Sequence, residues 1–148
     1  MLLGKEGGSV PKVDAALAMR CYVQVHQAIQ SRLVASCHDL SEGGLAVALS
    51  EMAFAGELGL DVDLTKYRSM NFVDSTVLLF SESNSRLLVE VPESQCIAFE
   101  KLMCDLPVER IGTVTQASTV RVSCDSQVLI DVQWKKLRDT WRSPLDFA

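Results

Sequence analysis

Apolar residues recur at helical spacing near the beginning of the chain. After a glycine-containing segment that ends at Pro11, Asp14 precedes a stretch whose apolar positions are three and four residues apart. This spacing predicts an amphipathic helix that Asp14 caps. The face that we expect to be buried carries Ala15, Met19, Tyr22, His26 and Ile29. We expect His26 to be a packed helix histidine rather than a ligand.

Shorter apolar runs and alternating patterns predict strands along the rest of the chain. Leu60, Val62 and Leu64 alternate with aspartates, as in a half-buried strand. Strands are expected at 33–37, 60–64, 86–91, 108–114, 119–124 and 127–132, with Asp125-Ser126 as a hairpin turn between the last two. Helices are expected at 45–56, 72–80, 93–105 and 134–141.

Helices and strands are mixed in this order rather than strictly alternating. The order favours an α/β (α+β) fold, a layered sandwich of a mixed, largely antiparallel sheet with helices. A chain of 148 residues fits one domain. We therefore expect a single domain over 14–148, with 1–13 as a linker or cut end of something upstream.

The charge balance excludes some partners. With 14 basic and 19 acidic residues, the formal net charge is -5, which argues against a nucleic-acid partner. The one local basic cluster is interpreted as the solvated face of the last helix: Lys135, Lys136, Arg138 and Arg142. No apolar run reaches the roughly 18 residues of a membrane span, so no membrane partner is expected.

The cysteines indicate a reducing, cytoplasmic setting. Their number is 5, none forms a CxxC pair, and most look like small buried apolar residues. Cys37 stands beside His38, which suggests a nucleophile and its base. Neighbours on a strand point to opposite faces, however, so we interpret Cys37 as structural.

The first candidate site follows the strand at 33–37. Its sequence, from His38 to Leu45, includes Gly43 and Gly44 and leads into a helix. Backbone N–H groups at such a helix start can hold a phosphate through Ser41, Glu42, Gly43 and Gly44. A carboxylate at the end of the strand, Asp39, suits Mg²⁺. The alternative is a capping box, with Asp39 as the N-cap and Glu42 three residues later.

The second candidate site is the polar stretch from Phe80 to Arg86, between two apolar segments. Glu82, Ser83 and Asn84 offer a carboxylate, a hydroxyl and an amide to a small polar substrate. The same residues also fit a plain Ser/Asn turn. The two interpretations stay open on composition alone.

Together the two segments carry a family resemblance. His38 to Ala53, followed by Phe80 to Arg86, resembles the C-terminal half of the phosphoribosylformylglycinamidine synthase family, small-subunit type. The segment Gly7 to Asp14 is similar to the junction before the last domain of that family, and Trp134 to Trp141 is similar to its C-terminal end. The resemblance covers nearly the whole chain.

The resemblance implies an ATP-dependent ligase of purine biosynthesis. Such an enzyme uses ATP and Mg²⁺ to activate formylglycinamide ribonucleotide, and ammonia then displaces phosphate to give formylglycinamidine ribonucleotide. The implied partners are the upstream domains of the same enzyme, a glutaminase and a small accessory subunit, besides nucleotide ligands. The catalytic histidine and most ATP contacts of the family lie in those upstream domains. We therefore expect this chain by itself to be inactive.

Residue roles follow from the same resemblance. In the first half of the family, the aspartate matched by Asp39 binds Mg²⁺, and a Glu-Ser-Gln matched by Glu82, Ser83 and Asn84 contacts substrate. This chain resembles the second half, where the positions imply an auxiliary site for ATP or ADP. Asn84 replaces the Gln, so its amide reaches less far.

Two alternatives remain. The chain could belong to a related enzyme, such as aminoimidazole ribonucleotide synthase, selenophosphate synthase, thiamine-phosphate kinase or the hydrogenase-maturation dehydratase. It could also be a stand-alone binding or scaffolding module without chemistry. A module would tolerate loss of Asp39, whereas a metal or phosphate site would not.

Overall fold

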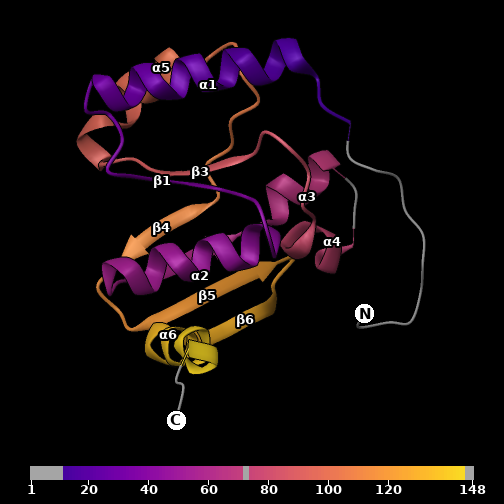
Figure 1. Cartoon of the computed structure of the whole chain (residues 1–148), viewed down its shortest axis with the longest axis vertical. Coiled ribbons are helices and arrows are strands. Elements are labelled where there is room, and N and C mark those ends of the chain that lie inside the picture. Colours follow the sequence, from indigo (N-terminus) through magenta and orange to yellow (C-terminus); the bar gives the residue numbers. More distant parts are fainter. Residues whose placement is uncertain (1–11, 72–73, 146–148) are drawn as a thin grey trace.

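The helices and strands of the chain form two packed regions that α2 and the paired strands β1 and β3 join (Figure 1). The structure is a computed structural model and describes residues 12–71 and 74–145. The expected linker at 1–13 therefore lies almost entirely outside the described residues. Among the residues that are described, no helix is long and apolar enough to cross a membrane.

Six α-helices and two 3₁₀ turns are present in the described part of the chain. The helices are α1 (Ala15–Gln30), α2 (Gly44–Gly56), α3 (Thr65–Asn71), α4 (Ser75–Phe80), α5 (Cys96–Leu102) and α6 (Trp134–Arg142). The 3₁₀ turns are η1 (Glu93–Gln95) and η2 (Ser143–Leu145). As expected, Asp14 caps α1 by accepting a hydrogen bond of 3.0 Å from the amide of Leu17.

The strands form two sheets rather than one. They are β1 (Ser36–Asp39), β2 (Gly59–Asp63), β3 (Leu87–Glu90), β4 (Gly112–Thr115), β5 (Thr119–Cys124) and β6 (Gln127–Gln133). β1 and β3 pair antiparallel, and the other four strands lie in the order β4-β2-β5-β6. Only the β2–β5 pair is parallel among these described pairings. The predicted fold class, with a mixed and largely antiparallel sheet, is confirmed.

The main core lies between α2, the four-stranded sheet and α6. It is aliphatic, and its most deeply buried side chains are Leu64, Val120 and Val122. Because inward residues of β5 alternate with outward ones, this strand buries one face only. A second, smaller core of Ala28, Phe99 and Met103 joins α1 to α5. Figure 1 shows these two helices together at the end of the molecule opposite α6.

The prediction for the buried face of α1 is wrong. Met19, Tyr22 and Ile29 are 63%, 48% and 46% exposed, and His26 and Ala15 are exposed as well. The buried residues are Ala18 and Ala28. Both the predicted face and the buried face have helical spacing, and the face with the larger apolar side chains was predicted to be the buried one. The helix buries its small side chains instead, which bring its backbone close to its neighbours.

Several element boundaries also differ from the expectations. β1 lies three residues later than the apolar run at 33–37, and β4 begins only at Gly112. The helix expected at 93–105 is a 3₁₀ turn followed by the shorter α5. A helix was expected at 72–80 and is found at Ser75–Phe80, while residues 72–73 lie outside the described part. The polar helix α3 has no apolar stripe to predict it and was missed.

The predicted hairpin turn is confirmed. Asp125 and Ser126 both have positive φ, 48° and 64°, which is the type I′ geometry that suits the twist of β5 and β6. The expectation that most cysteines are buried is wrong. Cys124 is buried, Cys21 and Cys96 are half-buried, and Cys37 and Cys104 are exposed.

Candidate functional site

The loop after β1 turns on two glycines. Gly43 is the N-cap of α2 with φ 75°, Gly44 follows with φ 61°, and no side chain caps the helix. The alternative of an Asp39–Glu42 capping box is therefore wrong. The physical reason is that the helix begins only at Gly44, so its N-cap is Gly43, which has a left-handed backbone and no side chain to accept a hydrogen bond from the first turn.

Gly44 also lies against the second candidate segment. A Cβ at this position would lie 2.6 Å from the carbonyl oxygen of Ser81 and 2.9 Å from that of Leu79. Real Cβ atoms essentially never approach a backbone oxygen so closely. The glycine therefore permits the start of α2 to meet the end of α4. The two candidate segments, 35 or more residues apart in the sequence, become neighbours.

Two backbone N–H groups of the glycine turn have partners within the chain. The amide of Gly43 donates to Glu82 Oε1 over 3.0 Å, and the amide of Gly44 donates to the carbonyl oxygen of Ser41 over 3.1 Å. A carboxylate at this place interacts favourably with the positive end of the helix dipole. Glu82 thus connects the second segment to the first through a charged hydrogen bond.

Arg86 fixes the shape of the second segment. Its Nη2 donates to the carbonyl oxygen and, over 3.0 Å, to Oγ of Ser81, and its Nε donates to the carbonyl oxygen of Ser83 over 3.4 Å. At the other side of the loop, Tyr22 Oη lies 3.2 Å from Ser85 Oγ. The loop is therefore held by its own arginine and by a tyrosine of α1.

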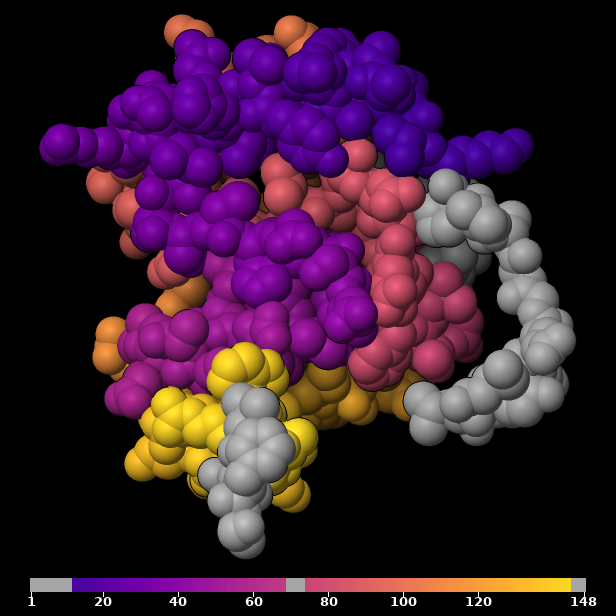
Figure 2. All heavy atoms as spheres, viewed as in Figure 1, coloured from indigo at the N-terminus to yellow at the C-terminus, as the bar shows by residue number. Residues whose placement is uncertain are grey.

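A pocket of ≈ 230 Å³ opens between these segments. Its walls come from α1, the end of β1 and the loop before β3: Tyr22, Asp39, Leu40, Ser41, Glu82, Asn84, Ser85, Arg86 and Leu87. Figure 2 shows the pink segment around residues 81–87 between indigo α1 and the purple start of α2. Four of the predicted site residues line the pocket: Asp39, Ser41, Glu82 and Asn84. The other four do not line it: Glu42, Gly43, Gly44 and Ser83.

The donor set of the pocket suits a hard cation. The side chain of Asp39 is 68% exposed, and Glu82, Ser41 and Asn84 add oxygen atoms around the same opening. No group of three or more His, Cys, Asp or Glu side chains that could hold a metal ion exists within residues 12–71 and 74–145. Mg²⁺ is commonly held by one or two carboxylates together with phosphate oxygens and water. The residues present fit that mode.

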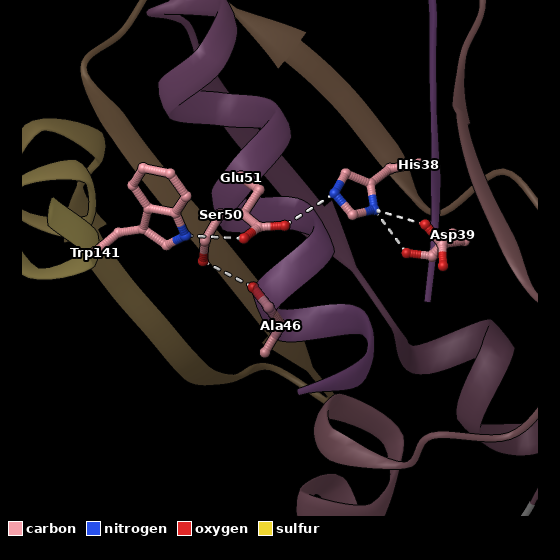
Figure 3. A network of polar contacts seen from close by, with 6 residues as sticks. All are labelled: His38, Asp39, Ala46, Ser50, Glu51 and Trp141. Carbon is pink, nitrogen blue, oxygen red and sulfur yellow. Dashed lines mark hydrogen bonds and ion pairs between the residues drawn. The ribbon is translucent and has the colours of Figure 1, made fainter. Parts of the chain in front are cut away.

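A chain of polar contacts leads from Asp39 into the protein (Figure 3). His38 Nδ1 lies 2.6 Å from the carbonyl oxygen of Asp39 and 3.7 Å from its Oδ1. His38 Nε2 lies 2.8 Å from Glu51 Oε2. Trp141 Nε1 donates to Glu51 Oε1 over 3.1 Å. One carboxylate of α2 thus joins the end of β1 to the C-terminal helix α6.

Cys37 is not part of a nucleophilic pair. It is exposed on one face of β1, while His38 on the other face contacts Glu51, so the expected divergence of the two side chains is confirmed. Burial, and in second place the negative charge of Asp39, raise the pKa of the Cys37 thiol above its ordinary value. A raised pKa lowers the fraction of reactive thiolate.

Four residues of this region were not assigned to the site by sequence reasoning. Tyr22 was expected in the core, and Arg86, Glu51 and Trp141 were assigned no role. The Arg86 contacts depend on a loop conformation that composition does not specify. The Glu51–Trp141 contact joins residues 90 positions apart and leaves no local pattern.

The fold and the pocket together define the class of protein. The chain belongs to the family described as AIR synthase related protein, C-terminal domain, whose model matches residues 2–125.

Similar proteins narrow the class further. The chain is similar to phosphoribosylformylglycinamidine synthase subunit PurL from Deinococcus radiodurans, at 37% identity over 143 residues, which is 96% of this chain and 19% of that protein. PurL from Thermosynechococcus vestitus is likewise 37% identical over 147 residues, again 96% of this chain and 19% of that protein. The chain thus spans about a fifth of these relatives.

Solved structures agree on the fold. The structure of Thermotoga maritima PurL complexed with FGAR has a TM-score of 0.77 at 20% identity, and the match covers 90% of this chain and 23% of that chain. The hydrogenase maturation protein HypE has a lower TM-score of 0.57 at 18% identity, and the match covers 75% of this chain and 41% of that chain.

Proposed function

We propose that this chain works as the last domain of a PurL-type synthase. The whole enzyme would make formylglycinamidine ribonucleotide from formylglycinamide ribonucleotide, ATP and glutamine-derived ammonia, in the cytoplasm. Within it, the pocket between Asp39 and Glu82 would bind Mg²⁺ and the phosphates of ATP or ADP. The similarity to PurL over 96% of the chain supports the enzyme class.

The single observation that carries the site is the meeting of Asp39, Ser41, Glu82 and Asn84 at one opening. If the first segment only began a helix and the second only formed a turn, their polar side chains would not be required to meet. Solved structures of Thermotoga maritima PurL complexed with ATP and with ADP share this fold, which supports a nucleotide as the ligand class.

The charges of the pocket make nucleotide binding depend on the cation. Asp39 and Glu82 repel phosphate, and Glu82 already accepts the Gly43 amide. The guanidinium of Arg86 donates to carbonyl oxygens of its own loop. Mg²⁺ would offset the two carboxylates and bridge them to phosphate oxygens. Ser41 and Asn84 would then orient the ligand, with Glu42, Gly43, Gly44 and Ser83 shaping the loops around it.

Calorimetric titration of the chain with ADP tests this proposal. We expect binding in the presence of Mg²⁺ and none in EDTA, with a loss of about 10-fold or more in Asp39→Asn, because the leading ligand loses its charge. Asp61→Asn is the matched control, since Asp61 is an exposed carboxylate of β2 that does not line the pocket. Equal affinities of wild type and Asp39→Asn would overturn the proposed site.

The enzyme would need more than this chain. Because the chain spans 19% of its PurL relatives, we expect it to form no product in an ammonia-dependent synthase assay. Upstream domains would supply the remaining contacts, and a glutaminase and a small accessory subunit would supply ammonia. A Thermotoga maritima PurLQS structure with this fold supports such an assembly. Product formation by the chain alone would refute this division of labour.

A non-catalytic binding module is the second candidate. The observation in its favour is that the amides of Gly43 and Gly44 are already bonded within the chain. Under this alternative the glycines serve packing alone, and Mg²⁺ and ADP would leave the chain unaffected. The titration described above separates the two candidates.

A further inference from the structure

We propose that His38 and Glu51 are positioning residues for Asp39. In this arrangement Glu51 holds the imidazole of His38, and the imidazole holds the end of β1 from which the Asp39 side chain projects. The cation-binding part of the inference rests on the proposed function. The ordering of Asp39 does not, because it concerns contacts within the chain.

The geometry puts His38 between two acceptor oxygen atoms, and the ring donates to both when each of its nitrogens carries a proton. Its Nε2 lies 2.8 Å from Glu51 Oε2, and its Nδ1 lies 2.6 Å from the carbonyl oxygen of Asp39. The side chains of His38 and Glu51 are 30% and 28% exposed, so water competes less for the contact between these two side chains than for an exposed pair. A partly buried, charged hydrogen bond is stronger than an exposed neutral one.

The backbone of Asp39 is held by the pairing of β1 with β3, whereas its side chain has few restraints. The side chain is 68% exposed, and its Oδ1 lies 3.7 Å from His38 Nδ1. The His38 ring adds to the strand pairing a contact at the point from which the Asp39 side chain projects. Partners of this kind orient the groups that bind a metal.

Glu51 serves two donors at once. Oε2 contacts His38 Nε2, while Oε1 accepts the indole N–H of Trp141 over 3.1 Å (Figure 3). Each carboxylate oxygen thus has its own donor, one from β1 and one from α6. The charge of Glu51 is shared by both contacts. A glutamine would keep the shape but lose the charge and one of the two acceptor oxygens, so the contact with His38 would be either weakened or lost.

The test compares Glu51→Gln with Trp141→Phe. Glu51→Gln weakens the contact with His38. Trp141→Phe removes the indole N–H that Glu51 accepts on its other side and keeps an aromatic ring beside Phe54, whose centroid lies 5.6 Å from that of Trp141 in the structure. His38→Gln is a second variant that removes the imidazole itself. Urea denaturation first checks that each variant is folded under the conditions of the measurements.

The first readout needs no ligand. Amide relaxation of Asp39 in ¹⁵N-labelled chains should show increased motion in Glu51→Gln and His38→Gln, and wild-type behaviour in Trp141→Phe. Unchanged relaxation in the first two variants overturns the proposal. Equal loosening in Trp141→Phe does so too, because it indicates general destabilisation.

The second readout is the Mg²⁺-dependent affinity for ADP. It should fall about 10- to 100-fold in Glu51→Gln, the usual range for residues that orient a metal ligand. If Asp39→Asn reduces the affinity for ADP but Glu51→Gln does not, the positioning role fails and the binding site stands. If neither variant alters affinity but Glu51→Gln loosens Asp39, the binding site fails and the positioning role stands.

Discussion

Replacing Gly44 by alanine tests the contact that brings the two loops together. The new Cβ would lie 2.6 Å from the carbonyl oxygen of Ser81 and 2.9 Å from that of Leu79. Both neighbours are backbone atoms, so no side chain can rotate away. The residue also has φ 61°, a left-handed conformation that alanine adopts only with strain.

Two costs add up in this variant. A left-handed backbone costs a residue with a Cβ about 1–2 kcal/mol. Forcing a methyl group into a packed site costs about 1–3 kcal/mol more, because the neighbouring backbone must shift. We therefore expect Gly44→Ala to lower the free energy of unfolding by about 2–5 kcal/mol in total, a large part of the stability of a domain.

Urea denaturation followed by tryptophan fluorescence measures this loss. Gly56→Ala is the matched control at the other end of α2, where the nearest atom to a new Cβ is Leu58 Cδ1 at 3.9 Å. Alanine should be accommodated there within about 1 kcal/mol of wild type. If Gly44→Ala were as stable as Gly56→Ala, the close approach of α2 to the Ser81 backbone would be refuted.

Three further changes have defined outcomes. Asp39→Asn should raise the alkylation rate of Cys37, measured by peptide mass mapping, because it removes the smaller of two causes that raise the thiol pKa; a slower rate would contradict this. Hydrogen bonds from the hydroxyl of Thr65 and, to a smaller extent, from its backbone amide lower the pKa of Asp63 below its ordinary value of 3.8. Asp63 therefore contributes stability that is fully present above pH 3.8 and is lost as the pH falls through the lowered pKa. Asp63→Asn should therefore destabilise the chain at neutral pH and lose this effect in acid, as urea titrations at both pH values would reveal. Ser126→Gly should stabilise the hairpin by about 0.5–1 kcal/mol in thermal unfolding, since glycine tolerates its φ of 64°; a lower melting temperature would count against the turn geometry.

Local chemistry made part of this structure predictable. Asp14 caps its helix, and the Asp125-Ser126 turn forms as expected, because both depend on residues within a few positions. The strand at 59–63 shows its alternation directly in the sequence. The fold class followed from the order of such elements.

Features that depend on packing between distant segments could not be predicted from local sequence patterns. The buried stripe of α1 depends on which neighbours it meets, and Ala28 packs against α5 where bulkier Ile29 does not. The separate β1–β3 sheet depends on pairing between residues about 50 positions apart.

For the site, sequence reasoning found the two loops but not how they are held. Asp39 was expected as a metal ligand and Glu82 as a substrate contact, and both line the pocket. The bond from Gly43 to Glu82 and the contacts of Arg86 and Glu51 required the folded arrangement. Such contacts depend on distances between segments, which no local pattern encodes.

Paramagnetic broadening by Mn²⁺, added with ADP in place of Mg²⁺, tests the proposed site most directly. Broadening of backbone amides falls steeply with distance from the ion, so it locates the ion without assuming a ligand set. We predict that the first signals to vanish come from Asp39 to Gly44 and from Glu82 to Arg86 together. Broadening centred instead on Asp61 and Asp131 of the four-stranded sheet, or spread evenly over the chain, would contradict a shared cation and nucleotide site between the two loops.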